Sequence, residues 1–337
     1  MAGTLHGFGL GVASKNAKGD VLDVFYPIPL ANISGDLVSI FDGVSGELKA
    51  TEIRALSDGL RSAGEHALAD IAVRLGEADQ PVVASLLADN AAPQTVADAY
   101  LKLHLLSHRL IKPHGTDLTG MFALLPNVAW TDEGPIDLAE LADRQLTSRL
   151  KGRVLEVASV DKFPKMTNYV VPSGVRIAHT ARVRLGAYLG SGTTVMHEGF
   201  INFNAGTDGP GMIEGRISAG VMVGKGSDLG GGCSTMGTLS GGGNIIISVG
   251  ESCLLGANAG LGIPLGDRCT VEAGLFVTAG TKVTVLDDAR EAVETLAARH
   301  LSGQSDLLFR RNSQSGSVEC LTNQTAIELN ESLHDNN

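Results

Sequence analysis

The chain has 337 residues, of which only 4% are aromatic and 43 are glycine, and its formal net charge is −11 at pH 7. This length has room for about two domains, and the acidic balance disfavours a nucleic-acid-binding surface. No stretch approaches the ~18 consecutive apolar residues of a membrane span, and the N-terminus lacks the basic start of a signal peptide. We therefore expect a cytoplasmic protein, whose four cysteines are reduced packing residues.

The first part of the chain contains an alternating segment and then helical periods. Residues 6–12 and 21–26 alternate between apolar and polar on either side of a polar loop, which predicts a β-hairpin. From about residue 36 to 110 the apolar spacing is helical, and residues 137–151 are predicted to form a further helix. We expect these elements to form an α/β domain over residues 1–165.

One helix in this region has a clear start signal. Thr95 and Asp98 have the spacing of a capping box, and Pro113 limits the helix at its other end. A solvated polar face is expected on this helix, rather than a ligand site, at Lys102, His104, His108 and Arg109.

Between about residues 168 and 285 an aliphatic residue recurs every six positions. A fixed six-residue period predicts a β-helix, in which three hexapeptides close one triangular coil and residues eighteen apart stack. The register breaks at Thr207 and restarts at Ile217. The positions in phase are Val171, Ile177, Val183, Leu189, Val195 and Ile201, and then Ile217, Val223, Leu229, Thr235, Gly241, Ile247, Cys253, Ala259, Leu265, Val271, Val277 and Val283.

Two interruptions of the period are candidate sites. Residues 207–216 are predicted to be a loop that leaves the prism and carries Asp208, Glu214 and Arg216. Loops on rigid scaffolds often carry function, although a plain solvated loop is the alternative. The glycine-rich residues 230–243 form the second interruption, where backbone N–H groups can approach a ligand closely, or where glycine only serves tight corners.

The repeat also raises the question of a metal. His179 and His197 are eighteen apart and should stack on successive coils, but a zinc site needs a third histidine and position 202 is Asn. Glu198 lies where a threefold assembly would bring three copies together, so a divalent cation on the axis is conceivable.

After Val283 the period ends. Residues 287–300 are expected to be a short helix or an excursion, and residues 307–321 a hairpin about a Gln-Ser-Gly turn. Residues 325–333 are expected to add a strand that helps to cap the last coil, because a solenoid needs its open ends covered.

Several segments together resemble a known family. Residues 196–207, 211–220, 237–243 and 309–313 are similar to the longer form of the tetrahydrodipicolinate N-succinyltransferases, and the resemblance covers nearly the whole chain. It implies a mainly β fold, in which a left-handed parallel β-helix of hexapeptide repeats at 166–286 follows the α/β N-terminal domain. The remaining residues, 287–337, would form a C-terminal helix and hairpin cap.

The same resemblance implies an activity. A homotrimer would transfer succinyl from succinyl-coenzyme A to the amine of ring-opened tetrahydrodipicolinate, on the route to diaminopimelate and lysine. The alternative is another hexapeptide acyltransferase that uses acetyl-coenzyme A. A non-enzymatic β-helix is a third reading, but such surfaces usually present regular threonine or polar ladders, which this sequence lacks.

The resemblance also implies site residues. Glu214 matches the catalytic carboxylate, which acts as an acyl-anhydride nucleophile in the family, although a general-base role is chemically sufficient. Glu198 matches a magnesium ligand on the trimer axis, where related enzymes add an aspartate and this chain has Ala181. The acyl-coenzyme A and substrate site would be lined by Arg216, Gly231, Ser234, Ala257, Glu272, Ala273, Gly280, Arg310, Arg311, Asn312 and Ser313.

One match fails on the coenzyme side. A family lysine corresponds to Ala297 in this chain, and Arg299 or Lys282 is expected to substitute for it.

Overall fold

The computed structural model describes residues 4–237 and 245–322. The chain divides into two compact units. The N-terminal unit comprises Met1–Ile111, Gly115–Pro164 and Asn168–Val170, and the solenoid unit comprises Lys112–His114, Lys165–Thr167 and Val171–Asn337. Within the described residues, every helix is too short or too polar to span a bilayer.

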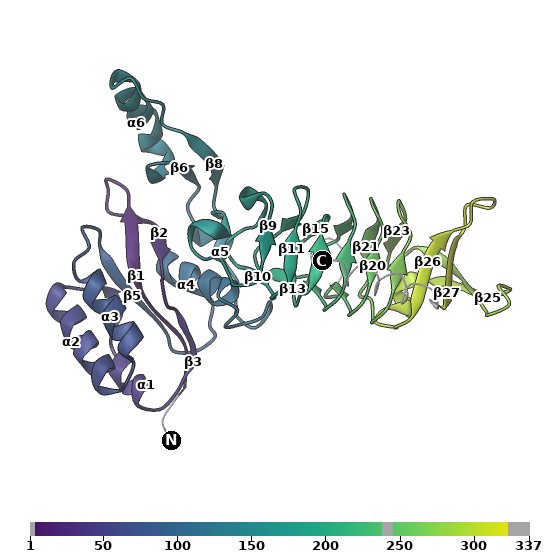
Figure 1. Ribbon diagram of the computed structural model, residues 1–337, viewed down its shortest axis with the longest axis horizontal. Helices are drawn as coiled ribbons and strands as arrows, with labels where there is room; N and C mark the ends of the chain where they lie inside the picture. Colours follow the sequence, from purple (N-terminus) through teal and green to yellow (C-terminus); the bar gives the residue numbers. More distant parts are fainter. Residues whose placement is uncertain (1–3, 238–244, 323–337) are drawn as a thin grey trace. The chain divides into compact units, whose positions relative to one another are not determined.

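The N-terminal unit is built on a five-stranded sheet (Figure 1). The predicted hairpin is confirmed as β1 (Leu5–Lys15) and β2 (Val21–Phe25). The helical prediction is wrong at Val82–Leu87, which forms strand β5 and pairs antiparallel with β1. A continuous apolar run of this length is typical of a buried strand, and periodicity alone does not distinguish it from a helix. The sheet is completed by β3 (Leu30–Ile33) and β4 (Gly46–Glu47).

Alternation along β1 assigns its two faces. Phe8 and Leu10 enter a core with α1 (Asp36–Phe41), α2 (Ala50–Ser62) and α3 (His66–Leu75), where the rings of Phe8 and Phe41 stack at 3.9 Å between centroids. Gly9 faces the other way, and a Cβ there would lie 2.8 Å from Leu101 of α4 (Val96–Ser107). Glycine therefore permits the close approach of α4 to the sheet.

Helix α4 begins as predicted, but its surroundings differ from the prediction. The capping box is confirmed: the Asp98 N–H donates to Thr95 Oγ1 at 3.0 Å, and the Thr95 N–H donates to Asp98 Oδ2 at 3.0 Å. The expected solvated face is wrong, because Lys102 and His104 are completely buried. Lys102 Nζ donates to Thr116 Oγ1 at 3.0 Å, so the buried ammonium has a polar partner inside the unit.

Buried His104 is held as a neutral ring. Its Nδ1–H donates to the Tyr100 carbonyl at 2.7 Å, and its Nε2 accepts from the Tyr26 N–H at 3.2 Å. Burial lowers the pKa of His104 from its ordinary 6.5 to about 3. The folded protein therefore leaves this ring unprotonated at pH values where the unfolded chain protonates it.

Stability should fall as the pH drops below 6.5, by about 1 kcal/mol between pH 6.5 and 5.5 from this residue alone, with a slope that approaches about 1.4 kcal/mol per pH unit at lower pH. Denaturant unfolding at pH 6.5 and 5.5 measures the change. His104→Gln should reduce the difference between the two pH values, whereas His66→Gln, at an exposed position, should not. An unchanged slope in His104→Gln would contradict this role.

The rest of the N-terminal unit is a small three-stranded sheet with a helix. Strand β6 (Val128–Thr131) pairs with β7 (Gly134–Asp137) and β8 (Val157–Asp161). The predicted helix at 137–151 is confirmed as α6 (Leu138–Leu150), and a short helix, α5 (Met121–Leu124), precedes the sheet.

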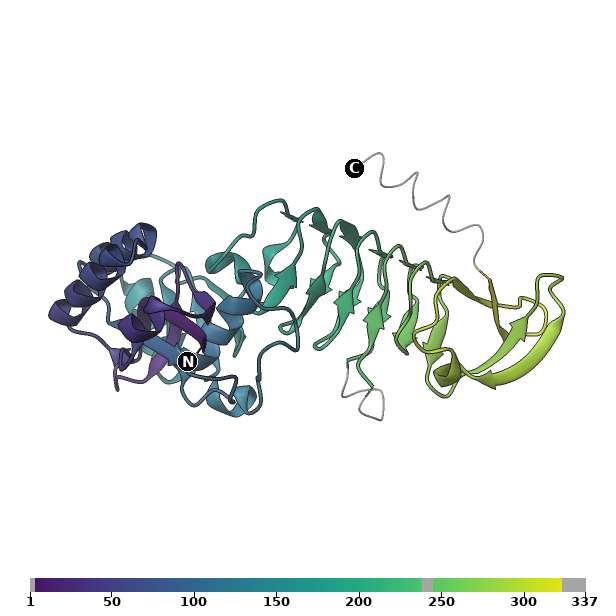
Figure 2. The same cartoon turned by 90° about the horizontal axis from the view of Figure 1, so that it is seen from below.

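The solenoid unit is a parallel β-helix whose coils stack along one axis (Figures 1 and 2). Its three sheets have the orders β10-β13-β16-β19, β9-β11-β14-β17-β20-β22-β26 and β12-β15-β18-β21-β23. The strands are β9 (Arg176–Ile177), β10 (Ala187–Leu189), β11 (Thr193–Val195), β12 (Phe200–Ile201), β13 (Ala205–Thr207), β14 (Gly211–Ile213), β15 (Arg216–Ile217), β16 (Met222–Val223), β17 (Asp228–Leu229), β18 (Ser234–Thr235), β19 (Ser248–Val249), β20 (Leu254–Leu255), β21 (Gly260–Gly262), β22 (Thr270–Val271) and β23 (Phe276–Thr278).

The first predicted interruption is wrong. Thr207 is completely buried and pairs with Leu189, eighteen residues earlier, and Ile213 pairs with Val195 in the same way. The Gly209 N–H donates to Thr207 Oγ1 at 3.0 Å, which satisfies the hydroxyl inside the prism. Residues 207–216 are thus part of a coil and not a loop that leaves it.

The phase shifts at the next corner instead. The inward residues Ile213 and Ile217 lie on successive strands, β14 and β15, but are only four residues apart. This corner is two residues shorter than a regular hexapeptide allows. Glu214 and Gly215 are the residues that remain at the corner between the two strands.

The second interruption is a longer coil. Thr235 pairs with Leu261, twenty-six residues later, and the extra length includes residues 238–244, which lie outside the described residues. Beyond it Val249 and Leu255 occupy the paired inward positions, so the phase has moved by two. Cys253, which the six-residue period predicted to point inward, is also buried, although Leu255 takes the paired inward position of this repeat.

The C-terminal end closes with antiparallel strands. The predicted hairpin at 307–321 is confirmed as β26 (Leu307–Arg311) and β27 (Val318–Thr322). Of the two alternatives at 287–300, the helix is wrong and the excursion is found. After a turn, β25 (Ala292–Ala297) returns antiparallel to β24 (Lys282–Leu286), and the 3₁₀ turn η3 (Ala298–Leu301) follows. The strand expected at 325–333 lies outside the described residues.

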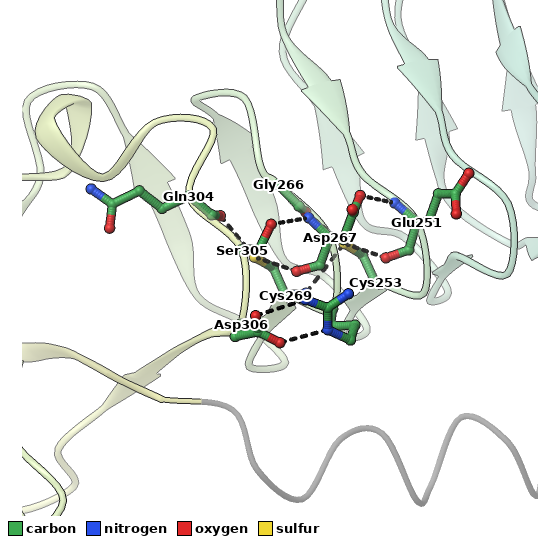
Figure 3. Close-up of polar contacts among 9 residues, drawn as sticks. Glu251, Cys253, Gly266, Asp267, Cys269, Gln304, Ser305 and Asp306 are labelled. Carbon is green, nitrogen blue, oxygen red and sulfur yellow. Dashed lines mark hydrogen bonds and ion pairs between the residues drawn. The ribbon is translucent and has the colours of Figure 1, made fainter.

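Polar contacts tie this end to the last coils (Figure 3). Ser305 Oγ accepts from the Asp267 N–H at 2.9 Å, and Asp267 Oδ1 accepts from the Glu251 N–H at 2.8 Å. Arg268 forms a bidentate ion pair with Asp306, with distances of 2.6 and 2.8 Å. All four cysteines are buried and free, as predicted.

Candidate active site

One edge of the prism gathers several of the predicted site residues. This edge, called here the corner column, is where β14, β17, β20 and β22 each turn toward the neighbouring sheet. The first residues after these strands are Glu214, Gly230, Gly256 and Glu272, and the residues after those include Gly231, Ala257 and Ala273.

Backbone hydrogen bonds hold the corner column together. The Glu214 N–H donates to the Leu229 carbonyl at 2.8 Å, and the Glu272 N–H donates to the Phe309 carbonyl at 2.9 Å. Adjacent coils are about 4.8 Å apart, so the four steps from Glu214 to Arg310 span about 19 Å. The column therefore has room for a long, extended molecule.

Small residues keep the backbone of the column accessible. A Cβ on Gly256 would lie 2.5 Å from the Ala273 nitrogen, so only glycine fits there. A Cβ on Gly231 would meet only two side-chain oxygens within 4 Å, Glu214 Oε2 at 3.5 Å and Glu198 Oε2 at 3.8 Å. The carboxylates of Glu214 and Glu198 therefore face the same point beside Gly231.

A cavity of about 460 Å³ lies next to these carboxylates. Arg216 on β15 enters its lining with its Nε–H donated to Ser234 Oγ at 3.1 Å, which brings two predicted residues into contact. The lining consists of Arg182, Glu198, Phe200, Gly215, Arg216, Gly232 and Cys233.

Cys233 is an unsuitable nucleophile in this cavity. Burial, together with the charge of Glu214, raises the pKa of the Cys233 thiol to about 12. Only the thiolate is an effective nucleophile, and at neutral pH this group stays protonated. The carboxylates are the remaining candidates for acid–base or nucleophilic chemistry here.

The far end of the corner column is a network around the β26–β27 hairpin. Glu272 Oε2 accepts from the Arg311 N–H at 2.7 Å. Arg310 Nε donates to Glu319 Oε2 at 2.9 Å, and Asn312 Nδ2 donates to Glu319 Oε1 at 2.7 Å. These two partners lower the pKa of Glu319.

Two predicted residues lie away from the column. Ser313 is exposed beyond the end of β26, and Gly280 lies in the turn between β23 and β24, with open space around it. Asp208, an alternative catalytic carboxylate, forms an ion pair with Lys112 at 2.7 Å.

The described residues of one chain provide no complete metal-ligand set. Among residues 4–237 and 245–322, no group of three or more His, Cys, Asp or Glu side chains could hold a metal ion. His179 and His197 are both exposed, and position 181 is an alanine. The oxygens available near Glu198 do not by themselves fit a magnesium site.

Arg182 is the charged cavity residue that sequence reasoning missed. It directly precedes the inward residue Val183, as Phe200 precedes Ile201 and Arg216 precedes Ile217. The strand register therefore places Arg182, Phe200 and Arg216 on one outward row. Reading the residue before each in-phase position would have found it.

Comparisons with known proteins agree with this architecture. Residues 125–165 match the family model described as "Tetrahydrodipicolinate N-succinyltransferase middle", and residues 246–279 match "Hexapeptide repeat of succinyl-transferase". The chain is 63% identical to a 2,3,4,5-tetrahydropyridine-2,6-dicarboxylate N-succinyltransferase of Pseudomonas paraeruginosa, over 100% of both chains. It is 58% identical to the Vibrio cholerae enzyme of that name, over 98% of each.

A solved structure extends the likeness to three dimensions. The crystal structure of a putative 2,3,4,5-tetrahydropyridine-2-carboxylate N-succinyltransferase from Campylobacter jejuni superimposes with a TM-score of 0.86 at 33% identity, covering 96% of this chain and 93% of that one. The solenoid is accordingly a left-handed parallel β-helix, and the chain is an acyltransferase. The chain belongs to the tetrahydrodipicolinate N-succinyltransferase family.

Proposed function

We propose that the chain transfers the succinyl group of succinyl-coenzyme A to the amine of ring-opened tetrahydrodipicolinate. The products are N-succinyl-2-amino-6-oxopimelate and coenzyme A, a step of diaminopimelate and lysine biosynthesis. The observation that carries the proposal is 63% identity over the full length of a named N-succinyltransferase. The reaction is expected in the cytoplasm.

The corner column meets the needs of acyl transfer from a thioester. The reaction requires space for a long pantetheine arm, donors for the developing oxyanion, and a group that takes the amine's proton. We assign the arm to the row of small residues at Gly231, Ala257 and Ala273, and the proton acceptor to Glu214. Arg216 follows Glu214 by two residues and donates to Ser234 Oγ, and we assign Arg216 and Ser234 to the acyl and substrate groups.

Glu214 has two chemically balanced roles. As a general base it takes the proton of the amine while the nitrogen attacks the thioester carbonyl and coenzyme A leaves as thiolate. As a nucleophile its oxygen attacks that carbonyl, releases the thiolate and forms a mixed anhydride, which the amine then opens. Both routes place the thioester carbonyl next to Glu214.

Positive charge near the far end of the column suits the anionic coenzyme. The net charge of the chain is −11, so cations must be concentrated where phosphates bind. We assign the positive charge to Arg310 and Arg311 and neutral hydrogen bonds to Asn312 and Ser313, with Glu272 holding the Arg311 backbone. Lys282 pairs directly with Ala297 across β24 and β25, so it can supply the charge of the family lysine.

We also propose a homotrimer with coenzyme A bound between neighbouring prisms. Flat prism faces pack readily about a threefold axis, and a groove between two chains provides more contacts than one exposed edge. Light scattering should give three times the chain mass of 34.9 kDa. A fully active monomer at micromolar concentration would contradict the proposal.

Magnesium bound by Glu198 on the trimer axis remains an expectation from the resemblance. Among the described residues of one chain, the carboxylates within 4 Å of a Cβ placed on Gly231 are those of Glu198 and Glu214. No step of the reaction is assigned to a metal.

The direct test of the function is thiol release. Purified protein is mixed with the stable analogue 2-aminopimelate and either succinyl- or acetyl-coenzyme A. Release with succinyl- but not acetyl-coenzyme A is expected. Equal or faster release with acetyl-coenzyme A would indicate the alternative acetyltransferase.

A further inference from the structure

Two cysteines lie next to each other near the C-terminal end of the β-helix. The pairing of Leu254 with Thr270 puts the residues directly before them, Cys253 and Cys269, in register on adjacent coils (Figure 3). Both side chains are completely buried. Adjacent strands are about 4.8 Å apart, and the Cα atoms of a disulfide are about 4.4–6.8 Å apart. The backbone spacing at this position therefore suits a disulfide.

Hydrogen bonds order both thiols and join the coils. The Cys269 N–H donates to Cys253 Sγ at 3.3 Å, so the sulfur of one cysteine contacts the backbone of the other. The Cys253 thiol donates to the Gly266 carbonyl at 3.1 Å, and the Cys269 thiol donates to the Gln304 carbonyl at 3.3 Å. Gln304 lies in the segment that leads into the capping strand β26, so the pair also holds this end of the solenoid unit.

The other two cysteines have different neighbours. The Cys233 sulfur packs against Gly215, and Cys320 pairs with Phe309 on β26 and with Val285 on β24. Both are buried nearly as completely as the adjacent pair. Burial therefore does not distinguish the four cysteines, whereas the in-register contact between two of them does.

The adjacent pair also differs in acidity. Burial raises the pKa of the Cys233 and Cys320 thiols to about 12. A hydrogen bond from the Cys253 thiol lowers the pKa of Cys269, and the same contact, together with burial, raises the pKa of Cys253. A thiol carries one proton, so the Cys253 S–H leaves the Gly266 carbonyl when it turns to the Cys269 thiolate. Because the thiolate is the reactive form, Cys269 should react first.

We propose that Cys253 and Cys269 are a modification site, at which a peroxide oxidises the two thiols to a reversible disulfide. The Cys269 thiolate attacks one oxygen of hydrogen peroxide, the O–O bond breaks, and hydroxide leaves a sulfenic acid on Cys269. The Cys253 sulfur then attacks the Cys269 sulfur and loses its proton, and the S–O bond breaks to release water. In total, two thiols and one peroxide give one disulfide and two waters.

The disulfide would change the contacts at the end of the solenoid unit. Its Cβ atoms are normally about 3.5–4.5 Å apart, so the two coils must approach each other slightly. Strained disulfides are reduced more easily, which makes the bond reversible. The Gly266 and Gln304 carbonyls lose their thiol donors, although Gln304 still accepts from the Gly266 N–H at 3.0 Å. Hydrogen peroxide is close to water in size and reaches the sulfurs when this end opens locally.

The test treats the folded full-length chain with hydrogen peroxide. Thiol titration in denaturant should then fall from four free thiols to two, and dithiothreitol should restore all four. Mass spectrometry of the digested protein should show a peptide pair that joins Cys253 to Cys269 and has lost two hydrogen atoms. In hydrogen exchange, the Asp306 N–H, which donates to the Asp267 carbonyl at 2.8 Å, should exchange faster after oxidation.

Serine variants provide matched controls. Ser227 precedes Cys253 in the same row of stacked positions, where its hydroxyl donates to the Gly250 carbonyl at 2.6 Å and accepts from the Cys253 N–H at 2.8 Å. A hydroxyl therefore fits this row, and Cys253→Ser and Cys269→Ser should fold. Dimedone should trap a sulfenic acid on Cys269 in Cys253→Ser, and none on Cys253 in Cys269→Ser. Cys320→Ser should leave the yield of the disulfide unchanged.

Four results would overturn the proposal. They are retention of all four thiols after peroxide treatment of the folded chain, equal loss of all four, a disulfide that joins Cys269 to Cys320, and a Cys253–Cys269 disulfide that forms only in denaturant. Trapping of Cys253 instead of Cys269 in the serine variants would contradict the assigned order of attack. None of these measurements depends on acyl transfer, so their outcome is separate from that of the proposed function.

Discussion

Glu214→Gln should lower kcat by about 10²-fold or more, the usual effect of losing such a group, and should leave the β-helix intact. The corner between Ile213 and Ile217 is two residues short, and the Glu214 N–H is bonded to the Leu229 carbonyl, so the backbone of Glu214 is held at one place on the prism. Glutamine keeps this shape but accepts no proton and forms no anhydride. Steady-state thiol release measures the loss.

Other carboxylates of the solenoid unit provide comparisons and a control for Glu214→Gln. Asp208 is paired with Lys112, and Glu272 accepts from the Arg311 N–H, so neither is an equivalent carboxylate. Glu251→Gln, at an exposed position on another corner, should keep normal kcat and serves as the matched control. If Glu214→Gln retained near-normal kcat, the assignment would be wrong. Trapping of succinyl-Glu214 by hydroxylamine would favour the anhydride over direct attack.

The six-residue period predicted the β-helix because each coil repeats the same demand for an inward aliphatic residue. The period gave a wrong prediction where a polar residue occupies an inward position or where a corner is shorter than usual. Thr207 satisfies its hydroxyl locally and stays inside the prism, so a polar residue in phase looked like a break. The true phase shift, between Ile213 and Ile217, is a deletion at a corner, which a list of in-phase positions does not locate.

The site could be predicted only in part. The resemblance supplied residues such as Glu214, Gly231 and Ala257, and the stacking of corners explains why residues far apart in sequence lie on one edge. Arg182 matched no motif, and only the strand register places it on the same outward row as Arg216, with Phe200 between them. Lys102 and His104 were assigned to solvent because a single helix does not reveal that the packing around it leaves them no solvent exposure.

Phe309→Ala should destabilise the solenoid unit by about 3–5 kcal/mol, the cost of truncating a fully buried phenylalanine. Phe309 is completely buried on β26, where it pairs with Val271 of the last complete coil and with Cys320 of β27. It therefore fills the end of the prism that the hairpin covers, and a solenoid without its terminal cap exposes its core. Denaturant unfolding measures the loss.

The same substitution elsewhere provides the control for the cap. Phe122 is 59% exposed, so Phe122→Ala removes less buried surface and should cost much less. Hydrogen exchange should show the difference locally: in Phe309→Ala, protection should fall first in β26, β27 and the Glu272 N–H, which bonds to the Phe309 carbonyl. Equal destabilisation by the two variants, or fraying that begins in the first coils, would show that the hairpin does not cap the β-helix through Phe309.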